Sequence, residues 1–241
     1  FTTLESENDD ARGAETEAEL AAQTAKIVAA ITAMDADILG LIEIENDLSA
    51  PDEAVAALVT AINASLGSTV YDFIPTGQVG TDAIKQAIIY KPDVVAPRGS
   101  SATLATPAFL DPLGAGRPLS RPAVAQSFTE IATGSVFTVS VNHLKSKGSE
   151  SGAAGPGGGP DDNPVEGSAA LTRVAAMEAL AAWIATDPTG SGDPDHLTIG
   201  DFNAYLEERA IAALEDEGFQ NLADDEAISY YFNGRGGTLD Y

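Results

Sequence analysis

The sequence IGDFNAY, residues 199–205, covers the end of a short apolar strand predicted at 196–203. That end carries Asp201 and Asn203. Side chains two residues apart in a strand lie on the same face, so these two groups are expected to point into one space. A charged group at the end of a buried strand is unfavourable unless a partner or a metal ion compensates it. The pattern therefore predicts a functional site at the end of a strand at 196–203.

Two further predicted strands end in the same way. The apolar run at 36–45 ends with Glu43 and Glu45, and an alternating run ends in Asn142 and His143. Any one of these residues taken singly is more often a strand-end cap or a turn former. A carboxylate from each of two strands can hold a hard divalent cation, because Mg²⁺ takes one or two carboxylates and completes its octahedron with water and substrate phosphate.

Composition narrows the chemistry further. The 241 residues include 44% hydrophobic and only 20% charged residues, which is the composition of a folded chain, and the net charge is −25. The absence of cysteine excludes disulfides, thiolate catalysis and cysteine-bound zinc, and two histidines leave little room for a histidine-rich metal site. Any metal must therefore sit on oxygen ligands. No apolar run approaches the about 20 residues of a membrane-spanning helix, so we expect no membrane span.

Charge is unevenly distributed along the chain. Residues 81–147 carry seven basic and four acidic side chains, a net charge of +3, although the whole chain is strongly acidic. A local cationic surface on an acidic body is typical of an enzyme that meets an anionic substrate at one face. A general adaptation for solubility or salt explains the overall acidity equally well, and both interpretations stay open.

Periodicity predicts alternating helices and strands. Helices are predicted at 14–34, from Pro51 to Leu66, at 168–186 and at 206–217. Strands are predicted at 36–45, 69–74, 84–90, 123–130, 135–143 and 196–203, with a hairpin in 230–241. The segment 148–167 contains seven glycines and three prolines, so it is predicted to be a long flexible loop.

Five segments together carry a resemblance. GLIEIEN (40–46), GTDAIKQAIIYKP (80–92), VNHLKSKGS (141–149), IGDFNAY (199–205) and LDY (239–241) resemble the endonuclease/exonuclease/phosphatase superfamily, in the order of the family. Within it, the chain looks most like the secreted bacterial extracellular nucleases. The resemblance implies an α/β (α+β) sandwich of two packed mixed β-sheets flanked by helices, the four-layer DNase I-like architecture, as one domain over 1–241.

The resemblance also assigns roles to residues. Glu43 matches the metal-binding glutamate of the family. Asp201 matches the aspartate that orients or activates the attacking water, with metal binding possible as well, and Asn203 matches its partner at the phosphate. His143 matches the histidine that contacts the scissile phosphate, and a pKa near neutral would let it donate a proton. Asp240 matches the aspartate that orients a catalytic histidine.

The remaining assignments concern substrate and cofactors. Asn142, Lys145 and Lys147 are predicted to contact substrate, although two exposed loop lysines with no such role are an equally good interpretation. The expected cofactor is Mg²⁺ or Mn²⁺, with Ca²⁺ as a structural ion. The expected substrate is DNA or RNA, with no obligate protein partner. A secreted or extracellular location follows from the resemblance alone.

The chain departs from the family pattern at both ends. The family begins with a strand that carries a metal-site asparagine and ends with a segment that supplies a catalytic histidine, whereas this sequence runs from Phe1 to Tyr241. We therefore expect a domain that is incomplete at both termini and weakly active or inactive by itself. His196 is no substitute, because it precedes the strand that delivers Asp201.

Two alternative functions remain open from the sequence. A phosphatase or a phospholipid phosphodiesterase acting on phosphoinositides or sphingomyelin would use the same metal and the same strand ends. A non-catalytic nuclease-like binding module of a larger secreted protein belongs to a different class. Missing catalytic groups, as at both ends of this sequence, are what would mark such a module. The central set is nevertheless intact, which favours truncation of an enzyme over decay; it comprises Glu43, His143, Asp201, Asn203 and Asp240.

Overall fold

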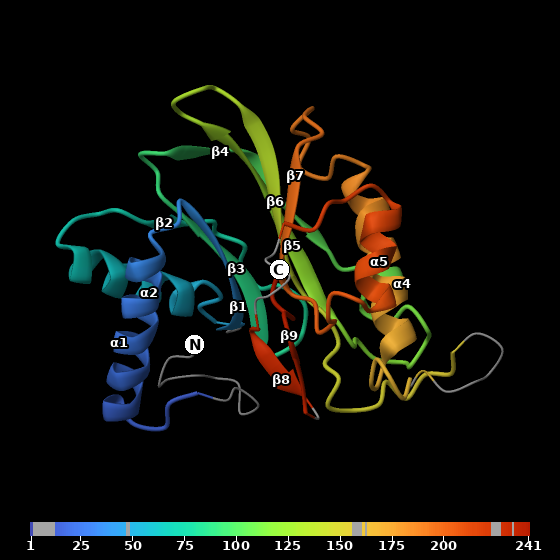
Figure 1. Ribbon diagram of the computed structural model, residues 1–241. Coiled ribbons are helices and arrows are strands. Elements are labelled where there is room, and N and C mark those ends of the chain that lie inside the picture. Colours follow the sequence, from blue (N-terminus) through green and yellow to red (C-terminus); the bar gives the residue numbers. More distant parts are fainter. Residues whose placement is uncertain (2–12, 47–48, 156–160, 162, 223–227, 233) are drawn as a thin grey trace. The chain divides into compact units, whose positions relative to one another are not determined.

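The chain forms two compact units. The computed structural model describes residues 1, 13–46, 49–155, 161, 163–222, 228–232 and 234–241 (Figure 1). Unit 1 comprises Phe1–Thr103, Val124–Val141 and Thr189–Leu197, and unit 2 comprises Leu104–Ala123, Asn142–Pro188 and Thr198–Tyr241. The prediction of a single domain over 1–241 stays a prediction.

Two helices of unit 1 follow the predicted periodicity. Helix α1 (Glu17–Met34) begins where the Thr16 side chain accepts a hydrogen bond from the Glu19 amide at 3.2 Å. Such a cap satisfies one of the amides that a helix start leaves unpaired. Helix α2 (Glu53–Leu66) ends at Gly67, whose φ of +72° suits a residue without a Cβ.

The first sheet of unit 1 has the strand order β1-β3-β2. Strands β1 (Ile38–Glu45) and β3 (Ile84–Tyr90) pair antiparallel, and β2 (Asp72–Phe73) pairs with the other side of β3. The register of β1 shifts between Leu41 and Ile44. A shared core joins α1, α2 and this sheet; it includes Ile31, Leu58, Ile62, Ala87 and Ile89. Apolar residues of the predicted helices and strands therefore share one core.

A second sheet has the strand order β4-β5-β6-β7. Its strands are β4 (Val95–Leu104), β5 (Arg121–Glu130), β6 (Val136–His143) and β7 (His196–Asp201). Strand β4 escaped prediction because it lies at the sheet edge, is mostly exposed and contains Pro97 and Gly99, residues that normally argue against a strand. Phe128 of β5 contacts Tyr90 of β3 in unit 1, with ring centroids 5.5 Å apart.

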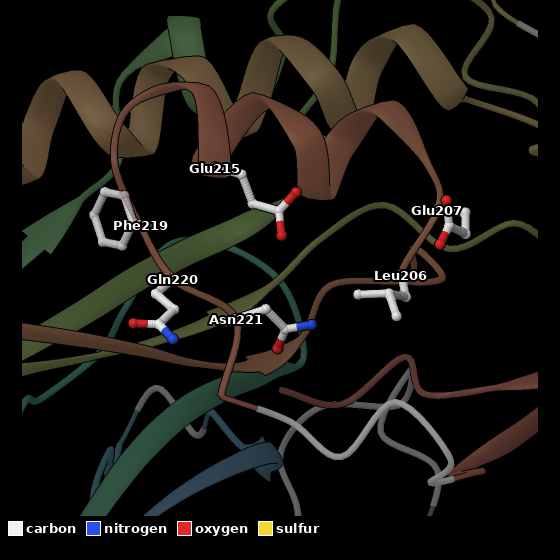
Figure 2. Close-up of a pocket in the computed structure, with 6 residues that line it drawn as sticks. All are labelled: Leu206, Glu207, Glu215, Phe219, Gln220 and Asn221. Carbon is white, nitrogen blue, oxygen red and sulfur yellow. The ribbon is translucent and has the colours of Figure 1, made fainter.

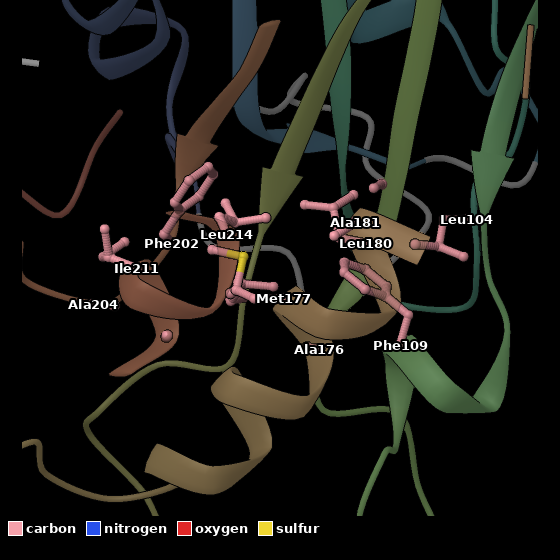
Figure 3. Close-up of a cluster of buried hydrophobic side chains, with 13 residues drawn as sticks. Leu104, Phe109, Ala176, Met177, Leu180, Ala181, Phe202, Ala204, Ile211 and Leu214 are labelled. Carbon is pink, nitrogen blue, oxygen red and sulfur yellow. The ribbon is translucent and has the colours of Figure 1, made fainter. Parts of the chain in front are cut away.

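Unit 2 has its own hydrophobic core. Helices α3 (Pro107–Leu110), α4 (Ala170–Ile184) and α5 (Arg209–Asp216) contribute to it, and Figure 3 shows Met177 and Leu180 of α4 near Leu214 of α5. A hairpin of β8 (Tyr230–Phe232) and β9 (Arg235–Gly237) follows.

Among the described residues, no helix combines the length and the apolar character needed to cross a membrane.

The predicted flexible loop at 148–167 is only partly described, because residues 156–160 and 162 lie outside the described residues. The Asp161 carboxylate accepts hydrogen bonds from the amide and the hydroxyl of Thr172 at 3.0 and 2.5 Å. The Glu166 carboxylate accepts hydrogen bonds from the Arg209 guanidinium at 2.6 to 3.0 Å. This end of the segment is therefore bonded to the helices that follow it, and the flexibility of the loop stays a prediction.

Candidate functional site

Gly200 allows the candidate site in unit 2 to form. A Cβ at this position would lie 2.1 Å from the backbone oxygen of Asn142, and the φ of +127° is one that other residues rarely adopt. The Leu144 amide donates a hydrogen bond to the Asp201 carbonyl at 3.0 Å. The glycine of the GDFN motif therefore lets the end of β7 approach the segment that carries His143.

His143 lies between a carboxylate and a guanidinium. Its Nε2 is 3.6 Å from Oδ2 of Asp201 and 3.4 Å from Nη1 of Arg121. The imidazole is buried, whereas 20% of the Asp201 side chain remains exposed. Sequence reasoning counted Arg121 only in the charge balance. The available signal was an arginine at the very start of an apolar strand, in SRPAVAQSF, where a charged residue needs a partner.

Burial makes His143 a neutral imidazole. Desolvation first, and the positive charge of Arg121 second, lower the pKa of His143 to about 3. The predicted near-neutral pKa is therefore wrong for this geometry. A neutral ring carries one N–H, so Nε2 either accepts a hydrogen bond from Arg121 or donates one toward an oxygen. Its chemistry is that of a hydrogen-bonding group and not of a cation.

Asn203 holds the Asp201 carboxylate in place. The Asn203 amide donates to Oδ1 of Asp201 at 2.8 Å, and its Nδ2 donates to Oδ2 at 3.2 Å and to the Leu144 carbonyl at 3.0 Å. The two side chains meet as predicted, but the reason differs. Strand β7 ends at Asp201, and Asn203 has a φ of +49°, a turn conformation that asparagine tolerates.

Asp240 reaches this site through backbone pairing. The segment LDY runs antiparallel to the end of β7, with a bridge between Asp201 and Asp240. The Gly200 amide donates to the Tyr241 carbonyl at 2.9 Å, and the Tyr241 amide donates back at 3.0 Å. Asp240 itself is exposed. Residues about 40 positions apart in the chain are thus adjacent in unit 2.

The Asn142 side chain is buried and hydrogen-bonded to strand β7. Its Nδ2 donates hydrogen bonds to Oγ1 of Thr198 at 2.7 Å and to the Ile199 carbonyl at 3.3 Å, and the residue is fully buried. Its Oδ1 has no hydrogen-bond partner among the described residues. The predicted substrate contact of Asn142 is therefore not available at the surface of this structure.

Lys145 and Lys147 are also buried, so their interpretation as exposed loop lysines is wrong. Lys145 Nζ donates to Oγ and the carbonyl of Ser149 at 2.7 and 2.9 Å. Lys147 Nζ pairs with the Glu208 carboxylate and donates to the Glu166 carbonyl at 2.8 Å. Burial lowers the pKa of both lysines. Their ammonium groups serve internal contacts here, which leaves Arg121 as the cation beside His143.

Arg173 completes the buried charge network around these lysines. It is fully buried, and its guanidinium donates to the carbonyls of Ser168 at 2.7 Å and Glu166 at 2.9 Å. Nη2 of Arg173, the atom that donates to the Glu166 carbonyl, also lies 3.8 Å from the Glu208 carboxylate. Sequence reasoning interpreted 168–186 only as an amphipathic helix and missed this arginine, because its carbonyl partners leave no pattern in the sequence.

Glu43 belongs to unit 1 and has different surroundings. It lies in the irregular part of β1 with a φ of +55°, its side chain is exposed, and its carbonyl accepts a hydrogen bond from the Phe1 amino group at 2.7 Å. Glu45 is only 1% exposed. The prediction that these two glutamates share a face is therefore wrong, because the register shift in β1 interrupts the alternation.

The chemistry of the donors fits a hard divalent cation. The Glu43 carboxylate in unit 1 is exposed, and the Asp201 carboxylate in unit 2, taken by itself, is partly exposed. Carboxylate oxygens are the ligands that Mg²⁺ and Mn²⁺ prefer, and Mg²⁺ takes only one or two of them. No group of three or more histidine, aspartate or glutamate side chains with metal-binding geometry occurs among the described residues.

Two comparisons of the sequence with known proteins found no match. No protein-family model matches the chain, and no curated protein matches it. Solved structures do match. The human Nocturnin catalytic domain with a bound sulfate anion is 19% identical with a TM-score of 0.53, over 84% of this chain and 64% of that domain. An endonuclease/exonuclease/phosphatase family protein from Bacteroides thetaiotaomicron is 16% identical with a TM-score of 0.53, over 90% and 67%.

The chain has the endonuclease/exonuclease/phosphatase fold. A mannosyl-6-phosphatase from Bacteroides thetaiotaomicron is also similar, at 15% identity and a TM-score of 0.53, over 90% of this chain and 69% of that protein. The predicted fold class, an α/β (α+β) sandwich of DNase I-like type, is thereby confirmed. None of these three structures is named as a secreted nuclease. The chain spans 64 to 69% of the length of the three.

Proposed function

We propose that this chain is a divalent-metal-dependent phosphodiester hydrolase of the nuclease type, acting on DNA or RNA. The observation that carries the proposal is the meeting of Arg121, His143 and Asp201 in unit 2, with Nε2 of His143 3.4 Å from the guanidinium and 3.6 Å from the carboxylate. A fixed cation, a neutral imidazole and an oriented carboxylate suit a reaction in which negative charge builds up on phosphate oxygens.

Asp201 is the group that would orient the attacking water. Both of its carboxylate oxygens are held by hydrogen bonds from Asn203, and part of its side chain remains open to solvent. A carboxylate in that state can accept a hydrogen bond from water and direct the water oxygen toward phosphorus. Attack forms a new P–O bond while the bond to the leaving oxygen breaks; the water passes a proton to the Asp201 carboxylate, and the leaving oxygen takes a proton from solvent. The Asn203 contacts keep Asp201 in one orientation.

Arg121 and His143 would stabilise the phosphoryl group. The guanidinium is a planar cation that can donate two hydrogen bonds to phosphate oxygens. His143, neutral because its pKa is lowered to about 3, would contribute one N–H. Burial of the imidazole places these donors in a region of low dielectric, where a preoriented donor stabilises developing charge more strongly than it would in water.

A divalent cation is part of the proposal, with Glu43 as a ligand and Asp201 as a second candidate. When bound, Mg²⁺ or Mn²⁺ supplies positive charge at the phosphate oxygens. A secreted location stays part of the same proposal and rests on the resemblance to extracellular nucleases.

The test compares hydrolysis by matched variants. Plasmid DNA and a single-stranded RNA are incubated with the chain in MgCl₂ or in EDTA, and initial rates are measured for the unchanged chain, Asp201→Asn and His143→Ala. We expect hydrolysis that requires Mg²⁺ and falls by about 10²–10³-fold in each variant, the usual cost of removing one group that acts in the transition state.

The second histidine provides the control. His196 is hydrogen-bonded to Ser140 in unit 1, with Nε2 and Oγ 3.1 Å apart, and is not assigned to the site. His196→Gln should keep at least half of the rate once its melting temperature shows that it is folded. A rate that Asp201→Asn leaves unchanged would overturn the proposal.

A phosphatase is the second candidate, favoured by the similarity to a mannosyl-6-phosphatase at the same TM-score of 0.53 as the other two structures. The same Asp201, His143 and Arg121 would serve a phosphate monoester. Mannose 6-phosphate, a phosphoinositide, sphingomyelin, DNA and RNA are therefore assayed side by side. Hydrolysis confined to a monoester or to lipids would replace the nuclease proposal.

A further inference from the structure

The hairpin β8–β9 presents two exposed tyrosines on opposite faces. Tyr230 pairs with Gly237 and Tyr231 pairs with Gly236, and the two side chains are 52% and 68% exposed. Residues directly opposite each other in an antiparallel pair project to the same face, and neighbours in one strand project to opposite faces. Tyr230 therefore shares a face with the Gly237 position, and Tyr231 shares the other face with the Gly236 position.

The face of Tyr230 is covered in part by Tyr205. A Cβ at Gly237 would lie 2.8 Å from Cδ1 of the Tyr205 ring, so that ring packs directly on the hairpin backbone there. On the other face, a Cβ at Gly236 would lie 2.5 Å from Cε1 of Tyr231, so the Tyr231 ring folds over its own hairpin. The two glycines leave room for these rings, and the hairpin side with Tyr205 and Tyr230 has two aromatic side chains.

This aromatic side is joined to the candidate site by short connections. Tyr205 lies two residues after Asn203, which holds Asp201. Ser229, the residue before Tyr230, accepts hydrogen bonds at Oγ from the amides of Leu239 at 2.9 Å and Asp240 at 3.4 Å. Asp240 in turn bridges to Asp201. The hairpin position of Tyr230 is thus tied through backbone contacts to the strand that carries the proposed water-orienting carboxylate.

We propose that Tyr230, beside Tyr205, is a stacking platform for an unpaired nucleobase of the substrate strand. This inference rests on the proposed nuclease function and deepens it, because it specifies single-stranded nucleic acid as the bound form. A tyrosine that keeps half of its surface exposed on an anchored hairpin offers a ring face at little entropic cost. Stacking on such a face is tolerant of sequence, because every base has a π-face.

The chemistry favours a base over a phosphate at this position. Tyr230 carries no charge, and Lys147, the cation near Tyr205, lies 5.2 Å from that ring centroid while it is paired with Glu208. The phosphate-facing donors are instead Arg121 and His143. Arg121 and His143 would therefore contact the phosphate of a nucleic acid strand, and Tyr230 would contact a base. Proteins that bind single strands commonly combine these two kinds of contact.

The test measures binding separately from hydrolysis. Fluorescence anisotropy with labelled single-stranded DNA and RNA of the same sequence is recorded in EDTA for the unchanged chain, Tyr230→Leu, Tyr230→Phe and Tyr231→Leu. We expect Tyr230→Leu to weaken binding by about 5- to 100-fold, the range found when one stacked base loses its aromatic partner. Tyr230→Phe keeps the ring and should bind within about twofold of the unchanged chain. The arm with the larger loss identifies DNA or RNA as the preferred source of the base.

Tyr231→Leu is the matched control, because it removes the same side chain from the opposite face of the same hairpin. It should bind as the unchanged chain does, and melting temperatures show that each variant is folded. Equal losses from Tyr230→Leu and Tyr231→Leu, or no loss from Tyr230→Leu, would overturn the platform. Hydrolysis of nucleic acid without a Tyr230 effect leaves the nuclease proposal intact, whereas Tyr230-dependent binding without Mg²⁺-dependent hydrolysis leaves only the platform.

Discussion

The ends of strands β1 and β7 show the same sequence signal and different structures. Both strands end an apolar run with polar residues two positions apart, Glu43 and Glu45 in one and Asp201 and Asn203 in the other. In unit 2, Asn203 donates two hydrogen bonds to the Asp201 carboxylate. In unit 1, Glu43 is exposed and Glu45 is buried. Residues two positions apart share a face only where the strand stays regular. At β7 the strand ends at Asp201, and the turn at Asn203 brings the two side chains together.

The difference comes from the backbone on either side of each pair. Strand β1 changes register between Leu41 and Ile44, so its last residues no longer alternate. Strand β7 instead contains Gly200, which permits contact with the Asn142 backbone just before Asp201.

Gly200→Ala should abolish the close approach at the end of β7. The added Cβ would lie 2.1 Å from a backbone oxygen that cannot move aside without disturbing its strand. We expect the free energy of unfolding to fall by about 3 kcal/mol or more. Urea unfolding followed by circular dichroism measures this change.

Gly134→Ala is the control for that change. Gly134 also has a positive φ, +77°, but no atom lies within 4 Å of its added Cβ. It should cost only about 1 kcal/mol, the strain of the left-handed conformation alone. Equal losses for the two variants would show that contact with Asn142 does not account for Gly200.

Substitutions of the two glutamates of β1 should differ in their effects on stability and on metal dependence. Glu45→Ala removes a side chain from a position that is 1% exposed and should lower the free energy of unfolding by about 2 kcal/mol. Glu43→Ala changes an exposed residue and should stay within about 0.5 kcal/mol. Chemical denaturation of both variants checks this pair.

The proposed metal role adds a second readout for Glu43. The Mg²⁺ concentration for half-maximal hydrolysis should rise at least about tenfold in Glu43→Ala, because even groups that only orient a metal ligand contribute that much to affinity. Titration of the hydrolysis rate with MgCl₂ measures it. An unchanged Mg²⁺ requirement would remove Glu43 from the metal proposal.

The other end of β7 begins with His196, whose burial should make stability depend on pH. Burial lowers the pKa of His196 to about 4, below the ordinary value of 6.5. Between pH 6.5 and 4 the unfolded chain therefore binds a proton that the folded chain does not, and stability falls as the pH falls. The contribution is about 1.4 kcal/mol per pH unit. His196→Gln should reduce the slope of unfolding free energy against pH by about that amount, as measured by urea unfolding from pH 7 to 4.5. A slope that is the same in both proteins would contradict it.

Regular elements were the predictable part of the fold. The predicted strand at 84–90 and the strand ending at His143 match β3 and β6, because buried strands need consecutive or alternating apolar residues. Strand β4 was missed, since an exposed edge strand with Pro97 and Gly99 has no such pattern. The short helix α3, Pro107–Leu110, was missed because four residues are too few for periodicity.

The candidate site was predictable in its residue types and not in its contacts. GDFN and the Asn-His strand end pointed to Asp201 and His143, which the structure brings to 3.6 Å. Arg121 could not be chosen from seven basic residues in 81–147, because only the pairing of strands places it beside His143. Lys145 and Lys147 were assigned to substrate on charge alone, and only the structure shows that both are buried and paired.

Sequence alone determined the strand-end motifs, the oxygen-only donor set and the resemblance that led to the fold, because these depend on residue types and local spacing. Tertiary structure decided which charges are free to act. Burial lowers the pKa of His143. Lys147 is paired with Glu208, whereas Glu43 is exposed. Solvation and long-range pairing set these outcomes, and both depend on residues that are distant in the chain and meet only when it is folded.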